Sequence, residues 1–399
     1  SPAAGQPAPG TEPAPDSGSG AAPGPEPAGV ASPAPAGPPI VIASVGQLSG
    51  IVGQAIGAGT KAVAAWVAEV NQAGGVNGQP VQYLVADDGA DPGRHQALVR
   101  EMVEQRHVVA FVYQLAPLSG SSSVKYLEQK RVPVVGSEAA SPWFDTSPMF
   151  FEQSTQGSLA AVPMLGAAAF YGSGKTKVGL VVCAEGVAIC EDAKRTLPEW
   201  DTKFGLEVVQ VQTASMAQPD YTAECLSLRN AGAELMAFIG DANSLIRLAR
   251  SCGNAGFRPQ FFFAQQQSQN QFLSEPLLEG AAGDALTAPW FLSSSPAVAE
   301  FQAALRRYAP GTAPDGQTSF GWAAAKLFER AAASVSGPIT SDALLDALWS
   351  LRGETLGGFT MPLSFQPDRP NPQKVCFNPI RIEKGRFTSA DNGAFRCVG

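Results

Sequence analysis

The sequence predicts an α/β protein made of two doubly wound parallel-sheet lobes. Short runs of β-branched and aromatic residues alternate with longer segments whose apolar residues recur at helical spacing, and this alternation occurs in two successive rounds. The chain has 399 residues, of which 45% are hydrophobic, so it is long enough to bury the cores of more than one domain.

The first round starts at residue 40. Residues 40–45 are an apolar run that predicts a strand, and residues 57–73 predict a helix because Ala62, Trp66 and Val70 share one face. Strand, helix and strand in repeated order indicate a parallel sheet with helices on both faces. The other elements predicted in this round are strands over 81–86, 108–112 and 132–135 and helices over 92–105 and 121–130.

The second round repeats the same order and predicts a second lobe. Ligands of such sheets bind beyond the carboxyl ends of the strands, so two lobes that face each other form a cleft. The predicted elements are helices over 157–171, 189–204, 221–231 and 243–255 and strands over 177–182, 207–211, 235–239 and 260–263.

Residues 1–38 differ in composition from the rest of the chain. They are rich in Pro, Ala and Gly and contain no aromatic residue, so they cannot bury enough apolar surface to offset the entropy of ordering. We predict a disordered spacer that tethers the protein to a surface anchor; a tail without a role is the alternative. No stretch reaches the roughly 18 consecutive apolar residues of a membrane-spanning helix, so membrane contact is expected only through such an anchor.

Six cysteines lie between residues 183 and 397, and their even number without metal-type spacing favours disulfides. Their order suggests three local pairs, although six cysteines allow fifteen pairings. Disulfides indicate an oxidising compartment, whereas six free thiols would indicate the cytoplasm. The suggested pairs are Cys183 with Cys190, Cys225 with Cys252, and Cys376 with Cys397.

Two classes of function are disfavoured. The formal charge of −8 leaves no basic excess for nucleic-acid phosphates. An enzyme is not supported either, because no Gly-x-Ser-x-Gly elbow, metal-type cluster or histidine-based triad occurs, and His95 is expected on a solvated helix face. Residues 172–176 imitate the end of a phosphate-binding loop but precede a strand instead of following one. We therefore expect no cofactor and no catalytic residue.

Five phrases carry a family resemblance. In their order and spacing they resemble the branched-chain amino-acid-binding proteins of ABC importers, and the resemblance covers about residues 40–387. The phrases are GQLSG (46–50), NQAGGVNGQP (71–80), DDGADP (87–92), RVPVVG (131–136) and RSCGNAGFRP (250–259).

The resemblance implies a periplasmic-binding type I fold whose chain crosses between the lobes three times, as a three-strand hinge. Lobe one would hold 39–153 and 288–358, and lobe two 154–287 and 359–399. The protein would be an exported monomer, tethered to the outer face of the cell membrane, that closes on a small molecule and delivers it to an ABC permease with its ATPase subunits. A ligand-sensing module of a receptor or regulator has the same fold and is the alternative.

The family's contacts to an amino-acid ligand are replaced here. Branched-chain binders grip the ligand carboxylate with a serine and a threonine, and the matching positions hold Pro117 and Ala140. A glutamate that holds the ammonium group is replaced by amides over 265–267, and a cleft tyrosine is missing near Glu185. We therefore expect a ligand other than a standard branched-chain amino acid.

The predicted contacts lie in the loops that follow the strands. The acidic ones favour a cationic ligand unless they cap helices or face water, and Trp290 with Phe291 would stack on a ring-shaped ligand unless they pack in the hinge. A neutral ring compound and a cation both stay open. The candidate ligand-binding residues are Gln47, Ser49, Tyr113, Gln114, Leu115, Ala116, Ser137, Glu138, Ala139, Glu185, Asp241, Asn243, Gln265, Gln266 and Trp290.

Overall fold

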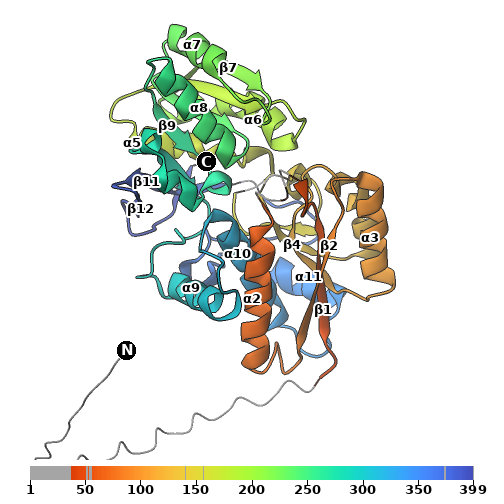
Figure 1. Cartoon of the computed structure of the whole chain (residues 1–399). Helices are drawn as coiled ribbons and strands as arrows, with labels where there is room; N and C mark the ends of the chain where they lie inside the picture. Colours follow the sequence, from red (N-terminus) through yellow and green to blue (C-terminus); the bar gives the residue numbers. More distant parts are fainter. Residues whose placement is uncertain are drawn as a thin grey trace, which may run out of the picture.

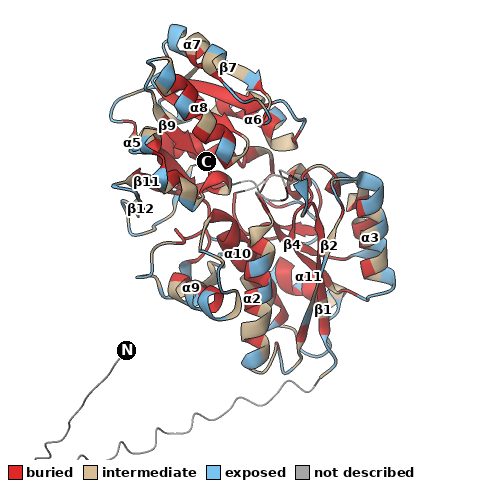
Figure 2. Ribbon diagram, viewed as in Figure 1, coloured by how far each residue is buried: buried red, intermediate tan, exposed pale blue. Residues whose placement is uncertain are grey.

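The computed structural model describes residues 37–50, 53, 56–139, 141–155, 157–372 and 374–398. The predicted spacer therefore lies almost wholly outside the described residues, as does Ala140. Within them the chain forms two α/β lobes, each built on its own sheet (Figure 1). Buried residues concentrate on the strands of both sheets and on the helix faces that cover them (Figure 2). No helix in this part of the chain is long and apolar enough to span a membrane.

The first lobe is built on a parallel sheet of order β2-β1-β3-β4-β5. Helices from residues 296–350 return to this lobe, and α10 contacts both β3 and β4. The strands are β1 (Ile40–Gly46), β2 (Val81–Asp87), β3 (Ala110–Gln114), β4 (Val134–Ser137) and β5 (Phe150–Phe151). The helices are α2 (Ala58–Gln72), α3 (Pro92–Glu104), α4 (Val124–Lys130), α9 (Pro296–Tyr308), α10 (Gly316–Ala332) and α11 (Ser341–Ser350).

The second lobe is built on a sheet of order β12-β11-β10-β9-β8-β6-β7, with β13 paired to β11. Strands β6 to β10 pair in parallel, as predicted for a doubly wound unit. The strands are β6 (Lys177–Cys183), β7 (Glu207–Ala214), β8 (Leu235–Ile239), β9 (Gln260–Phe263), β10 (Ala282–Ala285), β11 (Val375–Glu383), β12 (Arg386–Ser389) and β13 (Arg396–Val398). The helices are α5 (Pro163–Tyr171), α6 (Ala188–Trp200), α7 (Thr222–Asn230) and α8 (Ala242–Asn254).

The C-terminal strands add an antiparallel edge that the prediction of purely parallel lobes did not include. β11 runs antiparallel to β10, β12 and β13. Lys384 and Gly385 join β11 to β12 with φ values of 52° and 67°, which is the backbone of a tight two-residue hairpin. The Lys-Gly pair is therefore the local sequence signal for this hairpin.

Three segments connect the lobes, and they bond to one another. The first follows β5, the second follows β10, and the third precedes β11. Thr287 of the second pairs with Thr360 of the third in an antiparallel bridge. Thr155 Oγ1 of the first lies 2.9 Å from the N–H of Cys376, which donates to it. Within the described residues, these three segments are the covalent connection between the two lobes.

All three disulfides lie in the second lobe, and they are the pairs that the order of the cysteines suggests. Cys183, at the end of β6, pairs with Cys190 in α6. The second disulfide joins α7 to α8, and the third joins β11 to β13, where Cys376 and Cys397 are directly opposite. Each disulfide therefore links elements that are already neighbours in the fold.

His95 corrects one sequence expectation, because the structure buries it completely instead of placing it on a solvated helix face. Its Nδ1 lies 2.8 Å from Oδ2 of the buried Asp88, which also accepts a hydrogen bond from Ser119 Oγ. Burial alone would raise the pKa of Asp88, but the hydrogen bonds from His95 and Ser119 lower it below the usual value. Gln114 completes the cluster, with its Nε2 3.5 Å from His95 Nε2, so this predicted ligand contact is part of the core.

Candidate ligand site between the lobes

A cavity of about 90 Å³ lies between the two lobes. It is at the carboxyl ends of β6, β8 and β9, where ligands of doubly wound sheets bind. The first lobe contributes Ile56, Pro117, Glu138 and Gln317. The second lobe contributes Ala161, Met164, Cys183, Val187, Ile189, Cys190, Met216, Ile239, Gly240, Asp241, Ala242, Ala264, Gln266 and Gln267. A molecule held here would contact both lobes at once.

The cavity is small in this state of the protein. One water needs about 10–15 Å³, and a cavity of roughly 150 Å³ holds benzene in an engineered protein core. A volume of about 90 Å³ therefore has room for a few waters, and a ligand larger than that requires a small separation of the lobes. In this arrangement of the lobes the cavity fits only a compact molecule.

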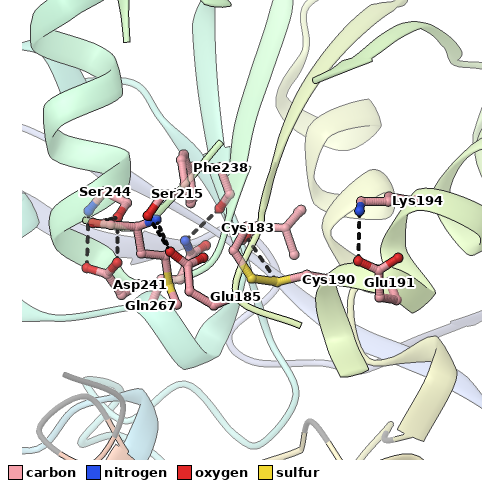
Figure 3. The surroundings of a disulfide bond; sticks show 12 residues. Cys183, Glu185, Cys190, Glu191, Lys194, Ser215, Phe238, Asp241, Ser244 and Gln267 are labelled. Carbon is pink, nitrogen blue, oxygen red and sulfur yellow. Dashed lines mark hydrogen bonds and ion pairs between the residues drawn. A yellow bond between two sulfur atoms is a disulfide. The ribbon is translucent and has the colours of Figure 1, made fainter. Parts of the chain in front are cut away.

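The Cys183–Cys190 disulfide forms part of the cavity wall. It closes the loop between β6 and α6, and the apolar side chains of Val187 and Ile189 from this loop line the same cavity. Figure 3 shows the disulfide with Glu185 and Gln267 on one side of it in that view and the ion pair of Lys194 and Glu191 on the other. The disulfide thus fixes a wall of the site as well as the fold.

Two of the polar side chains at the cavity are held by the protein itself. Gln267 Nε2 donates to the carbonyl of Phe238 at 2.7 Å, and its Oε1 accepts from the N–H of Ala264 at 3.1 Å. Gln317 Nε2 donates to the carbonyl of Gln266 at 3.1 Å and so ties the two lobes together. These amides shape the site and have few hydrogen bonds left for a ligand.

Glu138 reaches the cavity because the chain turns sharply after β4. Ala139 has a φ of 70°, and its N–H donates to Ser137 Oγ at 2.9 Å. Ser141 Oγ donates to Glu138 Oε1 at 2.7 Å, which orients the carboxylate. The predicted residues Ser137 and Ala139 therefore hold the turn, while Glu138 lines the cavity.

Asp241 lines the cavity as the N-cap of α8. Its carboxylate accepts hydrogen bonds from the N–H groups of Asn243 and Ser244 at 2.8 and 3.1 Å and from Ser244 Oγ. The free N–H groups of a helix N-terminus would attract an anion, but here the protein's own carboxylate occupies them. Asn243 itself is exposed and does not line the cavity.

Gln266 is different from the other amides, because neither its Oε1 nor its Nε2 has a hydrogen-bond partner in the described part of the chain, and both atoms are buried. A buried polar group without a partner costs about 1–3 kcal/mol. A ligand that supplied the missing partners would recover that energy. Of the fifteen residues predicted as ligand contacts, the structure brings Glu138, Asp241 and Gln266 to the cavity.

The predicted contacts after β1 brace the first lobe and do not line the cavity. The N–H of Gln47 donates to the carbonyl of Leu115 at 2.7 Å. Ser49 is exposed and bonds to Asp87, which also accepts from the N–H of Leu48 at 2.9 Å. Burial opposes ionisation of Asp87, but the hydrogen bonds from Leu48, Ser49 and Gly89 together outweigh it and lower the pKa to about 2. The loop is thus held by a carboxylate.

Tyr113 and Ala116 lie behind the cavity wall. The Tyr113 hydroxyl lies 2.9 Å from both the carbonyl of Ile56 and Oε1 of Gln317, so it supports two lining residues through one shared donor. The carbonyl of Ala116 accepts from the N–H of Gly120 at 2.9 Å. Both residues are fully buried and contribute structure instead of a surface for the ligand.

Glu185 is exposed and does not line the cavity either. Its Oε1 accepts hydrogen bonds from Ser215 Oγ at 2.6 Å and from the N–H of Met216 at 2.7 Å (Figure 3). These bonds hold the loop that follows β7, and Met216 of that loop lines the cavity. Glu185 positions a lining residue.

The structure corrects the prediction that Gln265 contacts the ligand. The hydrogen bonds of its side chain all go to the hinge. Its Oε1 accepts from the N–H groups of Leu286 and Thr287. Its Nε2 lies 2.9 Å from the carbonyl of Gly316 and 2.8 Å from Ser319 Oγ, both in α10. The side chain is completely buried, so it joins the lobes and has nothing to offer a ligand.

The structure also corrects the prediction that Trp290 contacts the ligand. Its ring packs against neighbouring aromatic rings, which is the alternative given in the sequence analysis. Its ring centroid lies 5.5 Å from that of Phe291 and 5.3 Å from that of Phe387, both in edge-on geometry. Trp290 is 2% exposed and borders a separate surface hollow away from the interlobe cavity. The cluster connects the segment after β10 to β12.

Sequence reasoning missed most of the cavity wall. Ile239 is the last residue of β8 and Cys183 the last of β6, so a search for strand ends would have found them. Met164, Met216 and Gln317 come from a helix, a loop and another helix, and no local pattern marks them. Only the tertiary fold brings them together.

Two parallel-sheet lobes that enclose a cavity and are joined by three crossover segments define a bilobal ligand-binding protein. Residues 39–380 match the family model of the periplasmic binding proteins, and the chain belongs to this family. The family consists of substrate-binding proteins, so the chain is a binding protein and not an enzyme, and membership implies a location outside the cytoplasm. No curated protein sequence matches the chain significantly.

Solved structures confirm the fold and the resemblance. A protein from Rhodopirellula baltica SH 1, described as a possible leucine/isoleucine/valine-binding protein, has a TM-score of 0.77 at 17% identity, with 91% of this chain and 98% of that chain covered. A branched-chain amino acid ABC transporter protein from Thermus thermophilus with bound valine has a TM-score of 0.74 at 18% identity, covering 88% and 95%. A solute-binding protein from R. palustris in complex with benzoate has a TM-score of 0.71 at 14% identity, also covering 88% and 95%.

Proposed function

We propose that this protein is the solute-binding subunit of an ABC importer, and that it captures a small organic molecule between its lobes by hinge closure. The observation that carries the proposal is a cavity lined from both lobes, which three segments connect in the part of the chain that the structure describes. A ligand that contacts both walls binds the closed arrangement more tightly than the open one, so it shifts the population toward closure.

The hinge is expected at the limits that the sequence analysis gives, with lobe one over 39–153 and 288–358 and lobe two over 154–287 and 359–399. The membership of β1 to β5 in one sheet and of β6 to β13 in the other supports this division. In the cell the protein would act as a monomer, and residues 1–38 would tether it to the outer face of the membrane.

The ligand is expected to be something other than a branched-chain amino acid. Pro117, which has neither a hydroxyl nor an N–H group, lines the cavity, and Gln266 offers an uncharged amide. Glu138 and Asp241 add two acidic groups, which oppose the carboxylate of an amino acid. Relatives of this fold have been solved with valine and with benzoate, so the fold accommodates ligands of different chemistry.

A thermal-shift screen over amino acids, aromatic compounds, amines and sugars tests the proposal. A ligand at 100 times its dissociation constant should add about 2.7 kcal/mol to the free energy of unfolding. Small-angle scattering should then show a smaller radius of gyration with the same ligand, because the lobes close. A hit that stabilises without compaction would contradict hinge closure, and a full screen without a hit would contradict solute binding.

The transport assignment needs a separate readout. Pull-down from membranes of the source organism with the ligand-loaded protein should recover a permease together with its ATPase subunits. Recovery of a sensor kinase or another signalling protein in their place would favour the ligand-sensing alternative.

A further inference from the structure

The charge of the cavity wall limits the ligand. Among the described lining residues two are acidic, Glu138 and Asp241, and none is Lys, Arg or His. The seven residues between 37 and 398 that lie outside the description are also uncharged in the sequence, being Ile51, Val52, Gln54, Ala55, Ala140, Gln156 and Gln373. An anion that entered this wall would lose its hydration without gaining a positive partner.

The N-terminus of α8 does not change this conclusion. It reaches the cavity through Gly240, Asp241 and Ala242 and would be the natural place for an anion. The Asp241 carboxylate already accepts from two of the first N–H groups of the helix. An anionic ligand would have to displace that carboxylate or lie beside it.

The apolar part of the wall is rich in sulfur. Met164, Met216 and the disulfide of Cys183 and Cys190 all line the cavity, whereas no aromatic side chain is among the described lining residues. Sulfur makes favourable contacts with aromatic rings, at about 0.3–1.5 kcal/mol each. The described lining residues supply no ring for these sulfur atoms to contact. An aromatic ligand would supply one.

One polar group at the cavity is unused. Gln266 has a buried donor and a buried acceptor without partners, and it lines the cavity from the second lobe. Because the amide has no hydrogen bonds to give up, its side chain can rotate toward a ligand without losing any. A ligand group with one donor and one acceptor, such as a carboxamide, would satisfy both atoms.

We propose that the cavity binds a compact uncharged aromatic molecule whose single polar group pairs with the Gln266 amide. This proposal rests on the proposed solute-binding function and specifies its ligand class. It predicts that negative charge on the ligand weakens binding and that loss of aromaticity removes the contacts with sulfur. A positive charge should not improve binding, because the carboxylates of Glu138 and Asp241 already accept hydrogen bonds from Ser141 and from the N-terminus of α8 and so offset less of the desolvation cost of a cation.

Four probes of nearly equal size test the three features by calorimetry on the whole chain. Benzamide is neutral, benzoate is the isosteric anion, benzamidine is the isosteric cation, and cyclohexanecarboxamide keeps the amide without the aromatic ring. Benzamide should bind at least about tenfold more tightly than each of the others, which corresponds to 1.4 kcal/mol. Equal or tighter binding of benzoate or benzamidine, or no binding of benzamide, would overturn the proposal.

Variants of Gln266 complete the test. Gln266→Leu should weaken benzamide binding about tenfold and leave the melting temperature without ligand unchanged or higher, because the amide has no partner to lose. Gln105→Leu, at an exposed site in the first lobe, is the matched control and should change neither. Gln266→Arg should admit benzoate, because it supplies the missing positive charge. Unchanged benzamide affinity in Gln266→Leu would refute the assigned role.

The outcomes separate the ligand class from the function. If the benzamide series fails while another solute from the broad screen stabilises and compacts the protein, the ligand class is wrong and the solute-binding function stands. If no solute stabilises or compacts the protein, both the ligand class and the solute-binding function are wrong.

Discussion

Gln265 of the second lobe donates a hydrogen bond of 2.8 Å to Ser319 of the first, across the hinge. The same side chain also bonds to the crossover segment after β10, through the N–H groups of Leu286 and Thr287. One buried amide therefore connects a strand end, a crossover segment and the first turn of α10. Such a junction resists any movement of the lobes that separates these three elements.

Replacement of Gln265 should destabilise the protein and loosen the hinge. Gln265→Leu leaves buried N–H and carbonyl groups without partners, each of which costs about 1–3 kcal/mol, so we expect a loss of about 3 kcal/mol in the free energy of unfolding. Gln266→Leu is the control, because it makes the same change one residue away at an amide with no partners. Urea denaturation measures both variants. Equal stability of the two would show that the Gln265 bonds contribute little.

The Cys183–Cys190 disulfide should matter more for ligand binding than for stability. In the chain-entropy model, the seven-residue separation of this pair predicts about 2.5 kcal/mol of stabilisation, against about 3.6 kcal/mol for the 27-residue separation of Cys225 and Cys252. Only the first pair lines the cavity.

Two double Ser variants distinguish these roles. Cys183→Ser with Cys190→Ser should weaken ligand binding about tenfold, because the cavity wall loses its fixed shape and its sulfur atoms. Cys225→Ser with Cys252→Ser should lower the melting temperature more and leave the affinity unchanged. Calorimetry measures the affinity of both variants, and thermal denaturation measures their stability. The prediction is wrong if only the Cys225→Ser, Cys252→Ser variant loses affinity.

Asp284 in β10 should make stability depend on pH. It is fully buried, and burial raises its pKa to about 8, although the backbone N–H groups of Gln265 and Asp284 favour the ionised form. Because the folded state binds this proton more tightly than the unfolded state, the stabilisation is complete below about pH 4 and is lost as the pH rises to about 8.

Asp284→Asn removes this titration, so its melting temperature should rise relative to the parent protein by several °C between pH 5 and pH 8. The readout is the slope of melting temperature against pH, because any constant cost of the buried amide cancels. Asp346→Asn, at an exposed site in α11, should keep the parent slope. If the stability of the parent protein does not fall between pH 5 and pH 8, the Asp284 carboxyl is not held neutral in the folded state.

The sequence predicts the strands and helices well because their signals are local. Periodic apolar residues placed α2 and β1 within a residue or two of their observed ends, and the order of the cysteines along the chain suggested the three disulfides. The site was harder, because Gln265 and Gln266 have the same side chain and adjacent positions. Only the surroundings, which place α10 against one and leave the other without partners, distinguish them.

The buried pair of His95 and Asp88 gives the last prediction. Their atoms lie 2.8 Å apart with both side chains fully buried, and Ser119 bonds to the same carboxylate oxygen. His95→Leu would leave the buried Asp88 carboxylate with fewer hydrogen-bond donors, and an unsatisfied buried charged group costs more than the roughly 1–3 kcal/mol of a neutral one. His107→Leu is the natural control, since the chain has two histidines and His107 is exposed.

Urea denaturation should therefore separate the two variants, with His95→Leu about 3 kcal/mol less stable than the parent and His107→Leu nearly unchanged. Adding Asp88→Asn to His95→Leu should recover part of the loss, because the uncompensated charge is then gone. Neither His95 nor Asp88 lines the cavity, so ligand affinity in the folded fraction should stay the same. Recovery by Asp88→Asn is the decisive observation, because a simple packing defect at residue 95 would not be relieved by neutralising its partner.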